Sequence, residues 1–250
     1  MQVSTYKLRP LLPPKDDLHE ALRVAHLKLR EGDIIAISSK VVSIGEGRTL
    51  LASKMSKENL ILREASWYQR TSRSKYGGKR IFTIAGGAMV SASGIDESNG
   101  NGHYILYPKH PKQSAKRLHD WFCKEYRIKT LGVIITDSTS IPLRRGAVGF
   151  ALAWHGFAPL KDYRQTPDLF GRLFQFETAN IADALATTAN LAMGEGNEQT
   201  PVAVIRAAPR IVFTKTNKEP LGQELAVTPE DDLFAPLFFS KKWKSNKKKR

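Results

Sequence analysis

The chain has 250 residues, of which 41% are hydrophobic and 25% are charged, which is the composition of a globular protein with a sizeable core. No uninterrupted run of about 18 apolar residues occurs, so we expect no transmembrane helix. Cys123 is the only cysteine, which excludes an internal disulfide. The N-terminus lacks the layout of an export signal, and we therefore expect a cytoplasmic protein with no membrane partner.

The net charge of +15 is unevenly distributed along the chain. The last ten residues carry seven positive charges and no negative ones, which leaves +8 for the rest. We expect one catalytic domain over residues 1–240, followed by a basic, disordered tail over residues 241–250. A second basic stretch, residues 70–80, fits a solvated helix face better than a nucleic-acid patch.

The N-terminal half predicts helices alternating irregularly with strands. Leu18, Leu22 and Leu29 repeat at helical spacing behind Asp17, a residue type that commonly caps helices. The apolar run 34–37 has strand length and predicts a strand buried on both faces. The expected elements are a helix over about 16–30, a strand over 34–37, a helix-permissive segment over 53–76 and strands over 81–85 and 104–107.

The C-terminal half contains the clearest strand of the sequence, residues 131–136. Ser114 is the predicted cap of a helix that contains Cys123, and both Cys123 and His155 are interpreted as packed core side chains. Gly194 is well placed to stop a preceding alanine-rich helix. The other expected elements are strands over 146–153, 201–206 and 211–213, a loop over 168–172 and a helix over about 174–193. This pattern predicts an α+β (mixed α/β) fold and excludes a regular doubly wound sheet.

Three acidic segments each follow an apolar element. Asp96 follows a strand, Asp137 and Ser138 follow the run 131–136, and Glu195 follows the alanine-rich helix. Carboxylate and hydroxyl oxygens are hard ligands that suit Mg²⁺ or Mn²⁺ bound together with substrate phosphates. One acidic residue in a turn is usually a solvated cap, but three in the same setting predict loops that converge on metal ions.

Phosphate recognition would depend on loop amides and basic residues. The sequence has neither a Walker-type loop nor a dinucleotide fingerprint. Ser39 and Lys40, at the end of a predicted strand, are candidate phosphate contacts. Arg144, Arg145 and Arg172 are candidates for anionic substrate groups, with a plain surface role as the alternative.

Six segments, in this order, resemble the family of coenzyme F420-0:γ-glutamyl ligases, GTP-dependent enzymes that add glutamate to a deazaflavin coenzyme. Each segment is weakly specific by itself, whereas the ordered set is specific. The resemblance covers about residues 9–213. The segments are SSKVVS with EGR (38–48), GIDESN (94–99), GVIITDS (132–138), RRGAVGF (144–150), DLFGR (168–172) and MGEG (193–196) leading to Pro201.

The resemblance implies a γ-glutamyl ligase-type fold that forms an intertwined homodimer. It implies GTP as co-substrate, two Mg²⁺ or Mn²⁺ ions as cofactors and K⁺ as a further candidate cation. The implied metal ligands are Asp96, Asp137, Ser138 and Glu195, and the implied catalytic residues are Asp96, Asp137 and Lys40. The implied nucleotide contacts are Leu11, Leu12, Ser39, Lys40, Asn99, Met193, Gly194, Gly196, Asn197, Glu198, Gln199 and Thr200.

The implied reaction joins L-glutamate to a carboxylate of the acceptor through an acyl phosphate. Two departures from the family pattern bear on the acceptor: Ile44 replaces a common lysine, and residues 139–143 lack a glycine–arginine pair. Residues 142–146 and 196–201 look like a bacterial branch proposed to act in folate metabolism. We therefore expect a folate-type pterin or its pteroate precursor to be favoured over the deazaflavin.

Three alternatives remain open from the sequence. The chain could be a ligase of the same design with another acceptor or amino acid, a ligase-like protein without turnover, or a basic nucleic-acid-binding protein. The acidic segments argue against nucleic-acid binding, because such a protein has no need for three carboxylates in one cleft.

Overall fold

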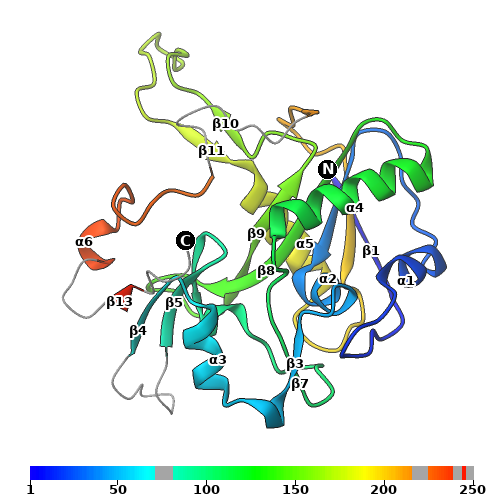
Figure 1. Cartoon of the computed structure of the whole chain (residues 1–250). Helices are drawn as coiled ribbons and strands as arrows, with labels where there is room; N and C mark the ends of the chain where they lie inside the picture. The colour runs from blue at the N-terminus through cyan, green and yellow to red at the C-terminus, as the bar shows by residue number, and fades with distance from the viewer. Residues whose placement is uncertain (71–80, 216–224, 239–243, 246–250) are drawn as a thin grey trace.

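The computed structural model describes residues 1–70, 81–215, 225–238 and 244–245. A five-stranded sheet with the order β1-β12-β2-β8-β9 forms its centre (Figure 1). Strands β2 and β8 run parallel, and the other neighbours run antiparallel. The strands are β1 (Gln2–Tyr6), β12 (Val202–Arg206), β2 (Asp33–Ser38), β8 (Leu131–Ser140) and β9 (Ala147–His155).

Helices cover both faces of this sheet. One face packs against α1 (Leu18–Val24), α2 (Ser39–Gly45) and α4 (Pro111–Tyr126), and the opposite face packs against α5 (Ile181–Met193). Because side chains of a strand alternate between faces, a strand covered on both sides must be apolar throughout. The continuous apolar run of β2 meets this requirement.

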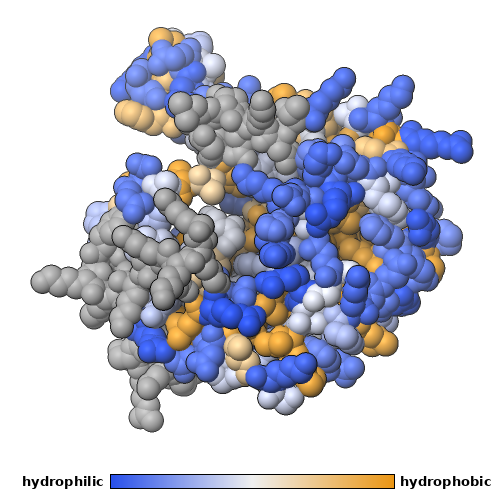
Figure 2. All heavy atoms as spheres, viewed as in Figure 1, coloured by the Kyte–Doolittle hydropathy of each residue, from blue (hydrophilic) through white to orange (hydrophobic). Residues whose placement is uncertain are grey.

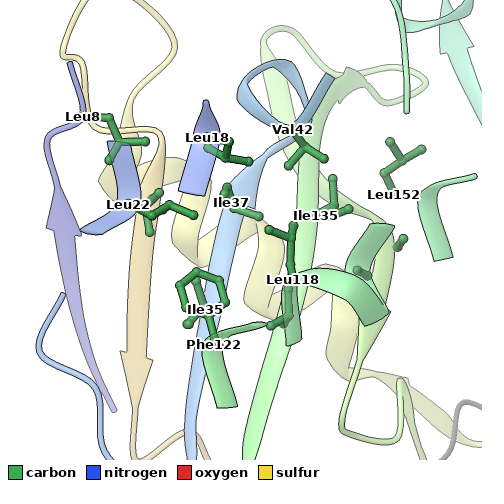
Figure 3. Packing of buried hydrophobic residues seen from close by; sticks show 14 of the residues in the cluster. Leu8, Leu18, Leu22, Ile35, Ile37, Val42, Leu118, Phe122, Ile135 and Leu152 are labelled. Carbon is green, nitrogen blue, oxygen red and sulfur yellow. The ribbon is translucent and has the colours of Figure 1, made fainter. Parts of the chain in front are cut away.

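The packing of β2 shows the alternation directly. Ile35 and Ile37 contact the α4 side of the core, and Ile34 lies on the α5 side. Figure 3 shows Leu118 and Phe122 of α4 over the same face as Ile35 and Ile37. Full burial of such a side chain contributes about 1.5–3 kcal/mol relative to exposure, so this sheet is a rigid support for the residues at its edge.

A smaller sheet with the order β13-β4-β5-β6 lies beside the central one (Figure 1). It packs with α3 and a two-stranded β3–β7 ribbon around a separate apolar cluster that includes Leu60, Ile95 and Leu106. The bounds are β3 (Thr49–Leu51), η1 (Ala52–Lys54), α3 (Lys57–Glu64), β4 (Trp67–Arg70), β5 (Ile81–Ala85), β6 (Ala88–Ser91), η2 (Ala92–Gly94), β7 (His103–Ile105), α6 (Ala235–Phe238) and β13 (Lys244–Ser245).

A two-stranded arm, residues 160–180, projects from the body of the molecule (Figure 1). Its strands are β10 (Leu160–Asp162) and β11 (Thr178–Asn180), which pair antiparallel. The Asp168 carboxylate accepts hydrogen bonds from the backbone N–H groups of Phe170 and Arg172, at 2.8 and 2.9 Å. The predicted loop over 168–172 therefore forms the tip of this arm.

The helix predicted over 174–193 begins later, at Ile181. The side chain of Asn180 caps it by accepting a hydrogen bond from the backbone N–H of Asp183 at 3.0 Å, and residues 174–180 belong to the arm. The helix predicted over 16–30 is likewise shorter than expected. Asp17 caps α1 as predicted, but the helix ends at Val24 because His26 takes a left-handed backbone conformation, with φ of 48°.

Residues 39–45, which follow the predicted strand, form α2, and Ser38 is its cap. Three other expectations need correction. Residues 53–76 form helix only over α3, before the chain enters β4. Helix α4 begins at Pro111, so Ser114 is not its cap and instead donates a hydrogen bond to Glu46 Oε1 at 2.5 Å. The run 211–213 contributes a single bridge, Phe213 to Phe157.

The mixed α/β fold class is confirmed, and the strands predicted over 34–37, 81–85, 131–136, 146–153 and 201–206 are all present. Residues 71–80, the core of the predicted basic helix face, lie outside the described part of the chain. Of the predicted tail only 244–245 is described, as β13 paired with β4. Within the described ranges, every helix is too short or too polar to cross a membrane.

Candidate active site

A cleft of about 270 Å³ opens where β2 ends and β8 passes beside it. Because β2 and β8 are parallel, with Ser38 opposite Thr136, the residues that follow these two positions emerge on the same side of the sheet. The segment 8–11 and the loop after α5 form two further walls. The predicted site residues that line the cleft are Leu11, Lys40, Asn99, Asp137, Ser138 and the run 193–200.

Lys40 lies at the centre of the charged part of this cleft. Its Nζ is 2.7 Å from Asp96 Oδ2. Burial lowers the pKa of Lys40, but the carboxylates of Asp96, Asp137 and Glu195 act on the same ammonium and raise the pKa overall. Carboxylates from three segments distant in the sequence therefore act on one cation. Their role as metal ligands stays a prediction.

Asp96 is held in place by its own turn. Its backbone exchanges two hydrogen bonds with Ile105, at 3.0 and 2.8 Å. Its Oδ1 accepts hydrogen bonds from the backbone N–H groups of Glu97 and Ser98, at 2.7 and 2.9 Å. Burial raises the pKa of Asp96, and Lys40 more than offsets this, so the group is ionised.

Asp137 lies on strand β8, not in a loop as predicted. Burial raises its pKa above the ordinary value, and Tyr107 and Lys40 only partly offset this. The Tyr107 hydroxyl beside Asp137 is buried and has no hydrogen-bond partner. Burial and the Asp137 charge raise the pKa of this hydroxyl. The Asp137 carboxyl and the Tyr107 hydroxyl therefore have too little positive charge and too few polar partners nearby to offset their burial.

Gly94 allows Tyr107 to reach this position. The glycine has a φ of 67°, and a Cβ there would lie 1.9 Å from Tyr107 Cζ. A side chain at residue 94 would therefore push the ring away from Asp137.

Glu195 is tied to β8 by a chain of polar side chains. Ser138 Oγ donates to Glu195 Oε2 at 3.0 Å, and Asn190 Nδ2 donates to Glu195 Oε1 at 2.7 Å. The Asn190 Oδ1 in turn accepts a hydrogen bond from Thr136 Oγ1 at 3.0 Å. These contacts fix a carboxylate that is otherwise exposed.

Asn190 and Thr136 were not predicted, although both line the cleft. Asn190 is the only amide side chain in an alanine-rich helix, and that contrast is the signal by which the sequence could have revealed it. Arg9 also lines the cleft, in ion pairs with Asp16 at 2.9 Å and Glu20 at 2.5 Å.

The loop over 193–201 closes on itself beside the carboxylates. Thr200 Oγ1 donates to the Met193 carbonyl at 2.7 Å, and Asn99 Nδ2 donates to the Gly196 carbonyl at 3.4 Å. The Gly196 N–H donates to Glu198 Oε2 at 2.8 Å. Gly194 has a φ of 81°, a conformation that favours glycine, and a Cβ there would displace the Glu198 carboxylate, whose carbon would lie 2.4 Å away.

Several predicted residues lie elsewhere. Ser39 is buried, Leu12 is 58% exposed, and neither lines the cleft. Arg144, Arg145 and Arg172 are exposed and do not line the cleft. Asp96 does not line the cleft itself, and it is connected to the cleft through its ion pair with Lys40.

The donor set fits a hard divalent cation. Asp96, Asp137, Glu195 and the Ser138 hydroxyl offer oxygen atoms, the type that Mg²⁺ and Mn²⁺ prefer. Burial is the main cause of the raised pKa of Asp137, and Lys40 only partly offsets it. A divalent ion would supply the missing positive charge.

Comparison with known proteins identifies the family of this chain. The family model of F420-0:gamma-glutamyl ligase matches residues 9–207. A protein of Methanococcus maripaludis named coenzyme F420:L-glutamate ligase is 33% identical over 239 residues, which cover 90% of this chain and 94% of the relative. Relatives of the same name from Methanopyrus kandleri and Methanocaldococcus jannaschii are 34% and 32% identical, over 82% and 90% of this chain and 86% and 93% of their own lengths. The chain belongs to the F420-0:gamma-glutamyl ligase family.

Proposed function

We propose that this protein is a ligase that joins L-glutamate by an amide bond to the carboxylate of a coenzyme F420-type acceptor, with GTP as the energy source. The names of the relatives support the acceptor and the amino acid. The observation that carries the proposal is the convergence of Asp96, Asp137 and Glu195 on Lys40 in one cleft. Such a set suits a polyanionic nucleotide with divalent ions.

The metal would be held by Asp96, Asp137, Ser138 and Glu195. When bound, it neutralises charge on the phosphoryl group that is transferred. The other functions, binding and orienting the substrates, belong to residues of the protein. Lys40, whose ammonium stays charged, can draw an incoming carboxylate or phosphate into the cleft.

The loop over 193–200 and the segment 8–11 are placed to hold the nucleotide. In this wall, the Gly196 N–H donates a hydrogen bond to Glu198, and the Asn99 amide donates one to the Gly196 carbonyl. Backbone N–H groups at such a loop can bind phosphate without a Walker-type motif. We infer that the Glu198 carboxylate leaves Gly196 when a phosphate oxygen takes its place.

The reaction would proceed in two steps. An acceptor carboxylate oxygen attacks the γ-phosphorus of GTP, the bond to the leaving GDP oxygen breaks, and an acyl phosphate forms. The glutamate amine then attacks the acyl carbon, inorganic phosphate leaves, and the nitrogen loses a proton to give the amide. Holding both reactants in one cleft supplies the orientation that each step needs.

A folate-type pterin is the second candidate acceptor. Ile44, at the position of the family's usual lysine, is 4% exposed and lines the cleft beside Val41 and Ile105. An apolar wall can stack a flat ring system, whereas the phosphodiester of the deazaflavin acceptor calls for a cation. This wall favours a pterin, and the names of the relatives favour the deazaflavin.

Product identification tests both candidates. Coenzyme F420-0 and pteroate would be offered at equal concentration with GTP, Mn²⁺ and glutamate, and the products separated by mass spectrometry. We expect glutamylated F420-0. Glutamylated pteroate alone would assign the acceptor to folate metabolism, and no product from either acceptor would refute the proposed ligase activity.

We also propose that the protein is a homodimer built on the projecting arm. Leu169, Phe170 and Phe176 are 97%, 95% and 92% exposed. Figure 2 shows orange apolar atoms on the lobe that projects from the body at the upper left. Exposed aromatic side chains gathered on one arm are typical of an interaction surface.

A further inference from the structure

A second cluster of ligand-type side chains lies outside the cleft. His119 and Asp120 belong to α4, and His155 is the last residue of β9. One ligand atom from each of the three residues lies within 4.8 Å of the others. None of them lines the cleft or contacts the carboxylates described above.

His155 supplies an independent sign of a missing partner. It is only 4% exposed, and its Nδ1 is buried without a hydrogen bond. An unsatisfied buried polar atom costs about 1–3 kcal/mol, so its persistence next to another imidazole calls for an explanation. A bound cation would use the lone pair of a neutral imidazole.

The neighbours of His119 provide a second sign. Its Nε2 is 3.6 Å from Cys123 Sγ, and its Nδ1 is 3.2 Å from Asp120 Oδ1. A proton on Nδ1 would make this contact a hydrogen bond to Asp120, whereas a proton on Nε2 leaves Nδ1 and the carboxylate oxygen as two adjacent ligand atoms. Two nitrogen or oxygen ligands of one tetrahedral zinc ion lie about 3.3 Å apart, because each bond is about 2.0–2.1 Å long.

The backbone at Gly156 lets the two rings meet. The His119 and His155 ring centroids are 4.6 Å apart with an interplanar angle of 62°. Gly156 has a φ of 90°, and a Cβ there would lie 2.1 Å from the Leu131 carbonyl oxygen and 3.0 Å from His119 Cδ2. The ring of His119 therefore occupies space that only a glycine leaves open.

We propose that His119, Asp120 and His155 bind one transition-metal ion of the Zn²⁺ class. Two imidazoles and one carboxylate suit zinc and similar borderline metals rather than Mg²⁺. Lys116 pairs with the other carboxylate oxygen, Asp120 Oδ2, at 2.5 Å, which leaves Oδ1 for the metal. The ion would join α4 to the end of β9, and the exposed Asp120 gives it a path from solvent.

The test is titration of tag-free, chelator-treated protein with Zn²⁺ by calorimetry, in excess Mg²⁺ so that the oxygen-donor site of the cleft is saturated. We expect one equivalent of Zn²⁺ to bind and the melting temperature to rise. Asp120→Asn should weaken binding by about tenfold or more, and His119→Gln should weaken it further. The matched control is His103→Gln, on β7 outside the cluster, which should bind zinc like the wild type.

His155→Gln would complete the set, with circular dichroism to check folding because residue 155 is buried. If it does not fold, His119→Gln and Asp120→Asn decide the result, since the Asp120 side chain is exposed and the His119 side chain is only partly buried. Absence of zinc binding to the wild type would overturn the proposal. Wild-type affinity in both variants would overturn it equally, because binding would then occur elsewhere.

Discussion

Replacing Lys40 with methionine should destabilise the metal-free protein. The Lys40 ammonium is the cation on which Asp96, Asp137 and Glu195 act, and its Nζ forms a 2.7 Å ion pair with Asp96. Methionine retains much of the apolar stem but removes the charge. The three carboxylates would then repel one another without compensation.

The magnitude follows from burial. Removing one partner of a buried ion pair costs about 3–5 kcal/mol, and exposed pairs contribute about 0–1 kcal/mol. The side chains of Lys40 and Asp96 are 33% and 24% exposed, which is between these limits. We therefore expect a loss of about 1–2 kcal/mol. For a protein of this size that corresponds to a melting temperature lower by about 2–8 °C.

The assay is thermal unfolding of wild type and Lys40→Met, first with a chelator and then with Mn²⁺. Mn²⁺ should raise the melting temperature of the variant more than that of the wild type, because the ion supplies the charge that lysine provided. Stabilisation by a ligand at 100 times its Kd is about 2.7 kcal/mol. The matched control is Lys57→Met, whose ion pair with Glu97 is 3.4 Å long and exposed.

Two results would refute this reasoning. One is a chelated Lys40→Met protein as stable as the wild type, which would mean that the carboxylates do not repel one another appreciably. The other is an equal Mn²⁺ response in both proteins, which would place the ion away from Lys40.

Three further predictions concern Asp137, Gly94 and the arm. Burial raises the pKa of Asp137, so its ionised form lowers the stability of the fold at neutral pH, and this loss disappears as pH falls through the folded-state pKa. In chelator, Asp137→Asn should therefore melt at a temperature no lower than that of the wild type. A clearly lower melting temperature would contradict the direction of the pKa shift. Gly94→Ala should destabilise more than Gly102→Ala by about 1–3 kcal/mol in denaturant titrations, because both glycines have positive φ but only residue 94 meets Tyr107; equal losses would remove the steric role of Gly94. The double change Phe170→Ser and Phe176→Ser should convert a dimer to a monomer in light scattering, whereas Val24→Ser, at an exposed apolar position of α1, should not; a wild-type monomer would contradict the dimer proposal.

The sequence predicts the central sheet well because its signals are strong. The run 34–37 and the run 131–136 are continuous apolar segments of strand length, and both are buried between helices. The parallel pairing of β2 and β8 then places Lys40 and Asp137 together. This rule covers only these two residues, because Asp96 follows η2 and Glu195 follows α5, neither of which is a strand of this sheet.

The remaining features depend on tertiary context. Residues 39–45 form α2 although Val41 and Val42 favour strands, because Ser38 caps the helix and Val42 packs in the core. Phe174 and Phe176 look like part of an amphipathic helix in sequence, yet they lie on the arm. No local pattern distinguishes a face buried by the same chain from one left exposed for a partner.

The most direct test of the account is glutamate ligation by wild type and Asp137→Asn, followed by mass spectrometry of the acceptor. Both proteins would receive coenzyme F420-0, GTP, Mn²⁺ and L-glutamate under the same conditions, after circular dichroism has shown that both are folded. The account predicts a glutamylated acceptor from the wild type and none from Asp137→Asn, because the substitution removes a carboxylate from the converging set. Product formed equally by both proteins would contradict the claim that this cleft carries the reaction.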